Sequence, residues 1–174
     1  MQLVLPSIRY KESFIAAVEE YQKEISNITV DFLSLKISEL KNDFQAYVDQ
    51  LICESFGKNL PPGYVPHTTY WLIDKNKYIG RVDIRHWLTQ QLLLEAGHIG
   101  YNIRPSKRRQ GYGKKILELA LPKAKELGIT KVLITCDETN LASKKVIEAN
   151  GGNFENSVFL SSNRPRKLRY WIVL

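Results

Sequence analysis

The chain has 174 residues, 44% of them hydrophobic, and carries a formal net charge of +7. This length supports one well-buried core and is small for two, so we expect a single domain spanning residues 1–174. The basic excess suits a polyanionic ligand, nucleic acid or an acidic surface, and composition alone does not separate these classes.

The two cysteines, Cys53 and Cys136, are too few for a disulfide framework. No grouping of cysteine and histidine has the spacing of a metal site, so we expect no metal. The first residues are too few for a signal peptide, and no apolar run approaches the ~20 residues that cross a bilayer. The simplest interpretation is a reduced, cytoplasmic protein with no membrane partner.

The N-terminal half has orderly patterns without a specific motif. We predict a strand over residues 3–5, a helix over 12–24 and a second helical region over 35–55. Residues 60–66 are rich in proline and form either a plain linker or the lining of a pocket. Residues 69–74 and 79–87, joined by a turn at 75–77, predict a β-hairpin.

Residues 97–104 predict a strand, with Ile99, Tyr101 and Ile103 on one face. The segment Arg-Arg-Gln-Gly-Tyr-Gly follows at 108–113. Its glycines can turn several N–H groups toward one anion, and the next helix adds its positive dipole end. The segment is therefore either a cradle for a pyrophosphate or an ordinary turn among solvated cations.

Apolar residues recur at helical spacing over residues 116–127, and Pro122 predicts a kink or break at 118–122. Residues 131–137 form an apolar run typical of a buried strand, so a parallel strand-helix-strand crossover is expected. Asn140 is a plausible N-cap of a further helix that ends at 150–152. Residues 153–161 and 168–174 predict two more strands.

Together these patterns resemble the GNAT superfamily of acyl-CoA-dependent N-acetyltransferases, most closely over residues 93–152. Its first signature is matched by Arg108, Gly111 and Gly113, and its second by the strand before Asn140, by Ser143 and by Gly151. The resemblance implies an α/β (α+β) fold. It implies a mixed, mostly antiparallel sheet of six or seven strands, with a central V-shaped splay and helices on both faces.

The resemblance also implies that acetyl-CoA lies in the splay and that its acetyl group passes directly to an amine in a ternary complex. Backbone groups near Ile103 would pair with the pantetheine arm, and Asn140 would contact the arm near the thioester. The implied donor-binding residues are Ile103, Arg108, Arg109, Gln110, Gly111, Tyr112, Gly113, Lys114, Asn140 and Ser143.

In this family the general base commonly lies on the strand before the glycine turn, and the candidates here are Glu95, His98 and Tyr101. Glu95 is expected on the strand face that carries Gly97. His98 has the better unperturbed pKa but would point to the opposite face.

Many members carry a tyrosine in the last turn of the helix after the conserved asparagine as the acid, and this chain has Ile147 there. Protonation of the thiolate then needs water or another group, and His86, Tyr101 and Tyr170 are candidates.

Two questions stay open at the level of sequence. A non-catalytic, basic CoA-binding or RNA-binding module is the alternative to the transferase, although nucleic acid is the less favoured partner. The basic cluster at Arg164, Arg166, Lys167 and Arg169 is either a solvated loop or a contact for RNA or an acidic substrate. The acceptor amine carries no readable motif, and the resemblance is compatible with a homodimer.

Overall fold

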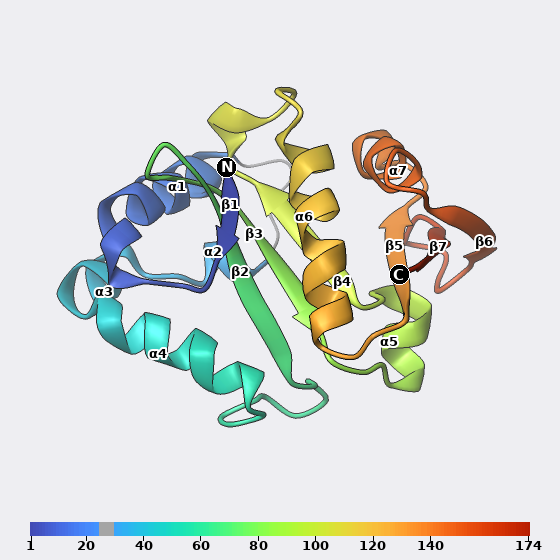
Figure 1. Ribbon diagram of the computed structural model, residues 1–174, viewed down its shortest axis with the longest axis horizontal. Coiled ribbons are helices and arrows are strands. Elements are labelled where there is room, and N and C mark those ends of the chain that lie inside the picture. Colours follow the sequence, from blue (N-terminus) through green and yellow to red (C-terminus); the bar gives the residue numbers. More distant parts are fainter. Residues whose placement is uncertain (25–29) are drawn as a thin grey trace.

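The computed structural model describes residues 1–24 and 30–174. In this part of the chain seven strands form two antiparallel sheets (Figure 1). The four-stranded sheet has the order β1-β2-β3-β4, and the three-stranded sheet has the order β5-β7-β6. Their bounds are β1 Gln2–Val4, β2 His67–Asp74, β3 Lys77–Arg85, β4 Ile99–Ile103, β5 Lys131–Asp137, β6 Asn153–Val158 and β7 Lys167–Val173.

Helices cover both faces of the larger sheet, as predicted (Figure 1). On one face, the N-terminal helices enclose an aromatic cluster around Phe14, Trp71 and Tyr78. On the other face, α6 packs its apolar stripe against the strands. The helices are α1 Lys11–Lys23, α2 Val30–Leu33, α3 Ile37–Asn42, α4 Phe44–Ser55, α5 Gln90–Glu95, α6 Tyr112–Glu126 and α7 Leu141–Glu148, with short 3-10 turns at Ile8–Tyr10 and Pro105–Lys107.

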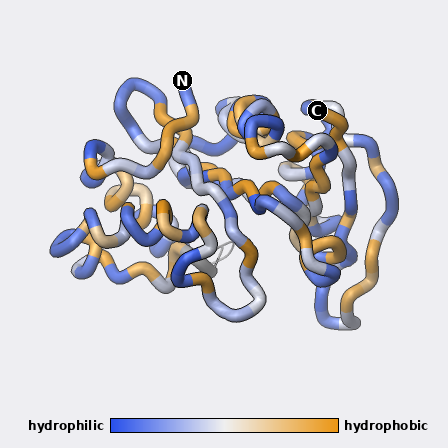
Figure 2. Tube along the Cα trace, turned by 60° about the horizontal axis from the view of Figure 1, so that its bottom comes forward, coloured by the Kyte–Doolittle hydropathy of each residue, from blue (hydrophilic) through white to orange (hydrophobic). Residues whose placement is uncertain are grey.

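Hydrophobic residues concentrate along the strands in the middle of the molecule, whereas the loops at its margins are mostly hydrophilic (Figure 2). The hairpin of β2 and β3 turns through Lys75 and Asn76, both with positive φ, as two-residue hairpin turns require. A register shift then leaves Ile79 without a partner on β2. Tyr78 consequently packs in the aromatic cluster while Ile79 packs beneath α6.

Of the two outcomes predicted at Pro122, a kink or a break, the break is wrong, because α6 runs without interruption from Tyr112 to Glu126. Pro122 is exposed, and the helix is held by the buried side chains Ile116, Leu117, Ala120 and Ala124 on its opposite face. Tertiary packing of this stripe offsets the ~3 kcal/mol that an interior proline costs an isolated helix.

The two sheets meet at one point between the start of β4 and the middle of β5. Gly97 forms an isolated antiparallel bridge with Ile134, and the His98 N–H donates to the Leu133 carbonyl oxygen at 2.7 Å. Gly97 has φ of 68°, and a Cβ there would overlap the Leu133 carbonyl, so only glycine fits. Beyond this junction β4 and β5 belong to different sheets, so the expected splay is present. The predicted parallel pairing of these two strands across the crossover is wrong, because they form no ladder.

Candidate active site

A cavity of about 1110 Å³ occupies the splay between β4, the start of α6 and the start of α7. Its walls come from β4 and residues 108–114 on one side and from residues 137–149 on the other. The cavity lining includes eight of the ten predicted donor-binding residues: Ile103, Arg108, Arg109, Gly111, Gly113, Lys114, Asn140 and Ser143. The remaining two, Gln110 in the turn and Tyr112 at the start of α6, lie outside the lining.

The backbone of β4 presents an unpaired edge to this cavity. The Arg104 N–H donates to the Ile79 carbonyl oxygen, so in the antiparallel alternation residues 102 and 104 pair with β3. The N–H and C=O groups of Tyr101 and Ile103 then point to the opposite side, toward the splay. Both backbone groups of Tyr101 and the N–H of Ile103 can hydrogen-bond an extended ligand as another strand would, whereas the Ile103 carbonyl oxygen already accepts from Arg108 Nε.

The turn at residues 108–113 leads directly into α6. Arg109 and Gly111 both have positive φ, 58° and 83°. The first N–H groups of α6, from Tyr112 to Lys114, have no partner within the helix and face the end of the cavity. A helix N-terminus with this many free donors favours an anion such as a phosphate.

Several side chains of the turn hold the protein together rather than pointing at a ligand. Arg108 donates to Glu24 at 2.7 Å and to the Ile103 carbonyl oxygen at 3.1 Å. The Gln110 amide donates to the Ser106 carbonyl oxygen, and the Tyr112 hydroxyl donates to Asp74. Arg108 can therefore serve a ligand through its backbone, while its guanidinium ties the turn to α1.

The start of α7 forms the opposite wall. The Asn140 side chain caps the helix by accepting from the Ser143 N–H at 3.0 Å. The Ser143 hydroxyl lies 3.0 Å from the Tyr101 hydroxyl, so the pair spans the cavity from β4 to α7. Burial raises the pKa of Tyr101 to about 12, which keeps this hydroxyl protonated at neutral pH.

The predicted position of Glu95 is wrong, because Glu95 is the last residue of α5 and does not lie on β4. Thr89 caps this helix by accepting from the Leu92 N–H, and the helix-forming run up to Glu95 follows the cap. The Glu95 carboxylate is 3.1 Å from Arg164 and does not line the cavity.

His98 lies at the junction of the sheets and also outside the cavity lining. Its Nδ1 accepts from the Leu133 N–H at 3.0 Å, replacing a ladder hydrogen bond. Burial, with a smaller effect of Arg85, lowers the pKa of His98, so the neutral imidazole that this acceptor role requires is favoured. Of the three candidate bases, Tyr101 alone borders the cavity.

The other candidate acids lie elsewhere. The His86 Nε2 is 2.8 Å from the Thr68 hydroxyl, the Tyr170 hydroxyl donates to Glu148, and neither residue lines the cavity. Ile147 is fully buried in the core. Among the candidates for protonating a thiolate in the cavity, Tyr101 is the one whose hydroxyl lies in its wall.

Among the cavity residues that were not predicted from the sequence, two lie on the side of α1. The Tyr21 hydroxyl of α1 donates to Asn102 of β4 at 2.9 Å, and both side chains line the cavity. Tyr21 has the helical spacing of a core residue, and Asn102 sits in a strand whose neighbours are apolar. The amide side chain of Asn102 in the middle of an otherwise apolar strand was the signal in the sequence that could have indicated a ligand-facing position.

Three residues of the C-terminal basic cluster form ion pairs within the molecule, and the fourth forms hydrogen bonds. Lys167 pairs with Asp137 at 2.7 Å, and Arg169 pairs with Glu155 at 3.1 Å. Arg164 pairs with Glu95, and the Arg166 guanidinium donates to Ser157. In contrast, ion pairs are absent within the described residues for Arg109, Lys114 and Lys145, which line the cavity.

Residues 1–24 and 30–174 contain no group of three histidine, cysteine or acidic side chains that could hold a metal ion. In the same part of the chain no helix has the length and apolar character needed to cross a membrane.

An extended edge beside a helix N-terminus, inside a splayed sheet, is suited to a long anionic ligand that lies between the two sheets. The model of the acetyltransferase (GNAT) domain matches residues 41–153. This chain therefore belongs to the GNAT acetyltransferase family, a class of acyltransferases.

Solved structures with the same fold agree with this assignment. The ribosomal L7/L12 α-N-protein acetyltransferase in complex with coenzyme A is 17% identical with a TM-score of 0.70, covering 99% of this chain and 93% of that one. The microcin C7 self-immunity acetyltransferase bound to acetyl-CoA and AMP is 16% identical with a TM-score of 0.69, covering 99% and 91%. A Salmonella typhimurium acetyltransferase that modifies the N-terminal serine of L7/L12 is 18% identical with a TM-score of 0.64, covering 99% and 94%. No curated protein matches the sequence significantly.

Proposed function

We propose that this protein moves the acetyl group of acetyl-CoA directly to an amine while both substrates are bound. The observation that carries the proposal is one continuous cavity joining the α6 N-terminus, the free edge of β4 and the Tyr101–Ser143 pair. Family membership and the CoA or acetyl-CoA named in two structural neighbours support the donor. The free thiols of Cys53 and Cys136 agree with a reducing, cytoplasmic setting.

In this proposal the donor lies along β4 with its pyrophosphate at the start of α6. The backbone amides of residues 109–114 hold the phosphates, and the backbone of Ile103 pairs with the pantetheine arm. Arg109 and Lys114 add positive charge, and binding of the phosphates breaks no ion pair between these two side chains and a described residue. The thioester then falls toward the closed end of the splay, near Tyr101.

The chemistry is an acyl transfer without a covalent enzyme intermediate. The amine nitrogen attacks the thioester carbonyl carbon, a C–N bond forms, the C–S bond breaks and the amine proton passes to solvent. We propose that the Tyr101 hydroxyl, hydrogen-bonded to Ser143, gives its proton to the departing thiolate and is reprotonated from solvent. Glu95 and His98 receive no base role here, because Glu95 is paired on α5 and His98 accepts the Leu133 N–H.

Calorimetry with CoA and release of free thiol from acetyl-CoA in the presence of amines test the proposal. We expect CoA to bind and thiol release to depend on an amine. Tyr101→Phe should lower kcat by about 10²-fold and change the CoA dissociation constant little, because it removes a proton donor and keeps the ring. Absence of CoA binding, or RNA binding in its place, would overturn the transferase.

A further inference from the structure

Asn102 and Tyr21 line the cavity on the side of α1. Successive side chains of a strand point to opposite faces of the sheet. Because Tyr101 and Ile103 pack beside α6, the Asn102 side chain lies on the other face of β4. There it meets Tyr21 of α1. The Asn102 backbone pairs with β3, so this residue offers no backbone group to a donor that lies along the edge of β4.

The orientation of the Asn102 amide is fixed by Tyr21. The amide oxygen accepts from the Tyr21 hydroxyl at 2.9 Å, and this is the hydroxyl's one hydrogen bond in the described part of the chain. Burial raises the pKa of Tyr21, so the hydroxyl keeps its proton and acts as the donor. The Tyr21 ring is buried and stacks on Phe32, with ring centroids 4.2 Å apart. The amide oxygen is therefore directed toward the hydroxyl and the amide nitrogen away from it.

The two N–H groups of the Asn102 amide remain for a ligand. The amide nitrogen donates to no described residue, and the half-buried side chain forms part of the cavity wall. Hydrogen-bond donors of this kind bind the oxygen of a carbonyl or hydroxyl group. Since the amide is already held in one orientation, binding such an oxygen costs little side-chain entropy.

The carboxylates next to Tyr21 in the sequence of α1 are already paired. Glu20 accepts from Arg104 Nη2 at 2.6 Å and from its Nε at 2.9 Å. Glu24 accepts from Arg108 Nη1 at 2.7 Å. Both carboxylates therefore join α1 to the segment that follows β4, rather than offering a site for an ammonium group.

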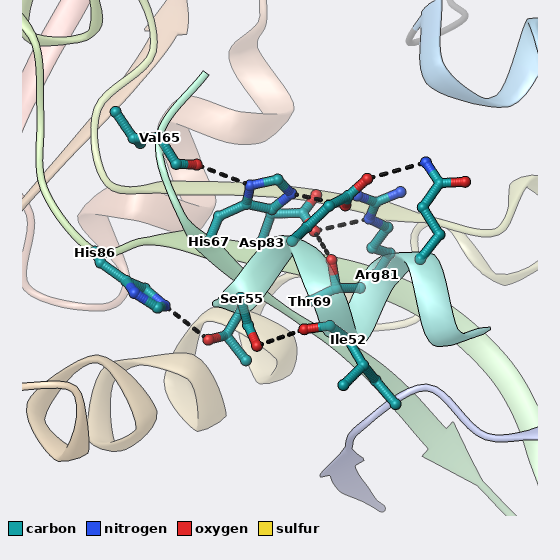
Figure 3. A network of polar contacts seen from close by, with 11 residues as sticks. Ile52, Ser55, Val65, His67, Thr69, Arg81, Asp83 and His86 are labelled. Atoms are coloured by element: carbon teal, nitrogen blue, oxygen red, sulfur yellow. Dashed lines mark hydrogen bonds and ion pairs between the residues drawn. The ribbon is translucent and has the colours of Figure 1, made fainter. Parts of the chain in front are cut away.

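Acidic side chains on the other elements are paired as well. Asp137 is the one acidic residue among the described residues of the lining, and it pairs with Lys167 at 2.7 Å. On β3, the Asp83 carboxylate accepts from Thr69 and Arg81 and lies outside the lining (Figure 3). The described lining thus holds no unpaired carboxylate for an ammonium group, whereas the Asn102 amide can bind an oxygen.

We infer that Asn102 is a specificity-determining residue whose N–H groups donate to an oxygen of the acceptor, so that the acceptor is an amine that also carries a carbonyl or hydroxyl oxygen. Tyr21 is the positioning residue that holds the amide for this contact. The inference rests on the proposed function, in which the donor occupies the edge of β4 and leaves the α1 side to the acceptor. An amine without such an oxygen leaves the Asn102 donors unpaired and is selected against.

Two matched pairs of amines test the inference by thiol release from acetyl-CoA: glycinamide with isobutylamine, and β-alaninamide with isopentylamine. Within each pair the shape is kept, while methyl groups replace the oxygen and nitrogen of the amide. The two pairs place the oxygen at two distances from the amine. Each amine is compared with itself in wild type and variant, so its own nucleophilicity cancels.

The main variant combines Asn102→Leu with Tyr21→Phe. Removing both polar groups leaves no buried hydroxyl without an acceptor, so the variant should fold. We expect kcat/KM for the better amide to fall by about tenfold or more, mainly through a higher KM. The value for its hydrocarbon partner, and the CoA dissociation constant from calorimetry, should stay within about twofold.

Two further variants separate positioning from a general loss of structure. Tyr21→Phe alone keeps the Asn102 donors but releases the amide, so its KM for the amide should lie between those of the wild type and the double variant. Asn153→Leu, at an exposed asparagine of β6, is the matched control and should behave as the wild type.

Equal losses for the amide and its hydrocarbon partner in the double variant, or an unchanged KM for the amide, would overturn the role of Asn102. Weaker CoA binding in the double variant would overturn it too, because the contact would then serve the donor. CoA binding by the wild type without turnover of any of the four amines would also count against it. Failure of the wild type to bind CoA would instead remove the proposed function.

Discussion

Gly111 and Gly128 adopt the same left-handed backbone, each with φ of 83°, and a Cβ at either position would meet no protein atom within 4 Å. Gly111 borders the cavity, whereas Gly128 follows the end of α6. Alanine at either position should lower the unfolding free energy by about 1 kcal/mol, because its side chain strains a left-handed backbone equally at both. We expect Gly111→Ala alone to weaken CoA binding, by at least tenfold.

Urea unfolding and calorimetry with CoA check this pair of variants. The match in stability loss is the control, since it shows that the backbone strain is equal. Equal CoA affinities in the two variants would contradict a ligand role for the turn.

The pKa of one histidine should lie above the ordinary value of 6.5, and the pKa values of the other two should lie below it. Hydrogen bonding to Glu54 and the nearby carboxylates raise the pKa of His67 against its burial, while burial lowers the pKa of His86 and His98. NMR titration of the imidazole signals should therefore show one group above pH 6.5 and two below it. Three midpoints on the same side would contradict the environments described here.

The pKa shifts of His67 and His98 make the free energy of unfolding depend on pH in opposite directions. The folded-state pKa of His67 is raised, so its contribution is fully present below pH 6.5 and is lost as the pH rises through the raised value. The folded-state pKa of His98 is lowered, so its contribution is present above pH 6.5 and is lost as the pH falls through the lowered value. At low pH, protonation of Nδ1 also removes the acceptor of the Leu133 N–H.

At the scale of elements, local signals predicted what depends on local geometry. The strand at Ile99–Ile103, the turn with Gly111 and the cap at Asn140 each follow from a few neighbouring residues, and the structure has them where expected. Helix α5 is only six residues long, and its cap at Thr89 was the signal that would have separated Glu95 from the strand.

Other features depend on chain segments that only the fold brings together. Tyr21 reaches Asn102 across 81 positions of sequence, and Arg108 reaches Glu24 across 84. The pairing of Asp83 with Gly100 likewise depends on the register of β3 and β4, which no local pattern determines. The donor half of the site was therefore predictable from sequence, and the side facing α1 was not.

At the scale of the whole molecule, the two sheets depend on the junction at Gly97. Gly97→Ala should lower the unfolding free energy by about 3 kcal/mol, because the new Cβ would collide with the Leu133 carbonyl and strain a backbone at φ of 68°. Chemical denaturation measures this loss. Gly151→Ala is the control, since Gly151 has φ of 84° in open space and should cost only about 1 kcal/mol.

If both variants lost the same stability, the contact at the junction would contribute nothing beyond backbone strain. The larger loss at Gly97 would instead show that the closed end of the splay, where the two sheets touch, needs this close approach of main chains.

The distribution of ion pairs also affects how quickly the protein finds its ligand. The basic residues at 164–169 are matched by acidic or polar partners, whereas Arg109, Lys114 and Lys145 form no ion pair with a described residue and leave positive charge at the cavity. Such a field attracts a polyanion from a distance comparable with the Debye length, about 8 Å at physiological salt. Rising ionic strength should therefore slow the association of the proposed donor, acetyl-CoA, much more than it speeds dissociation, because the positive charge at the cavity acts mainly on the rate of encounter.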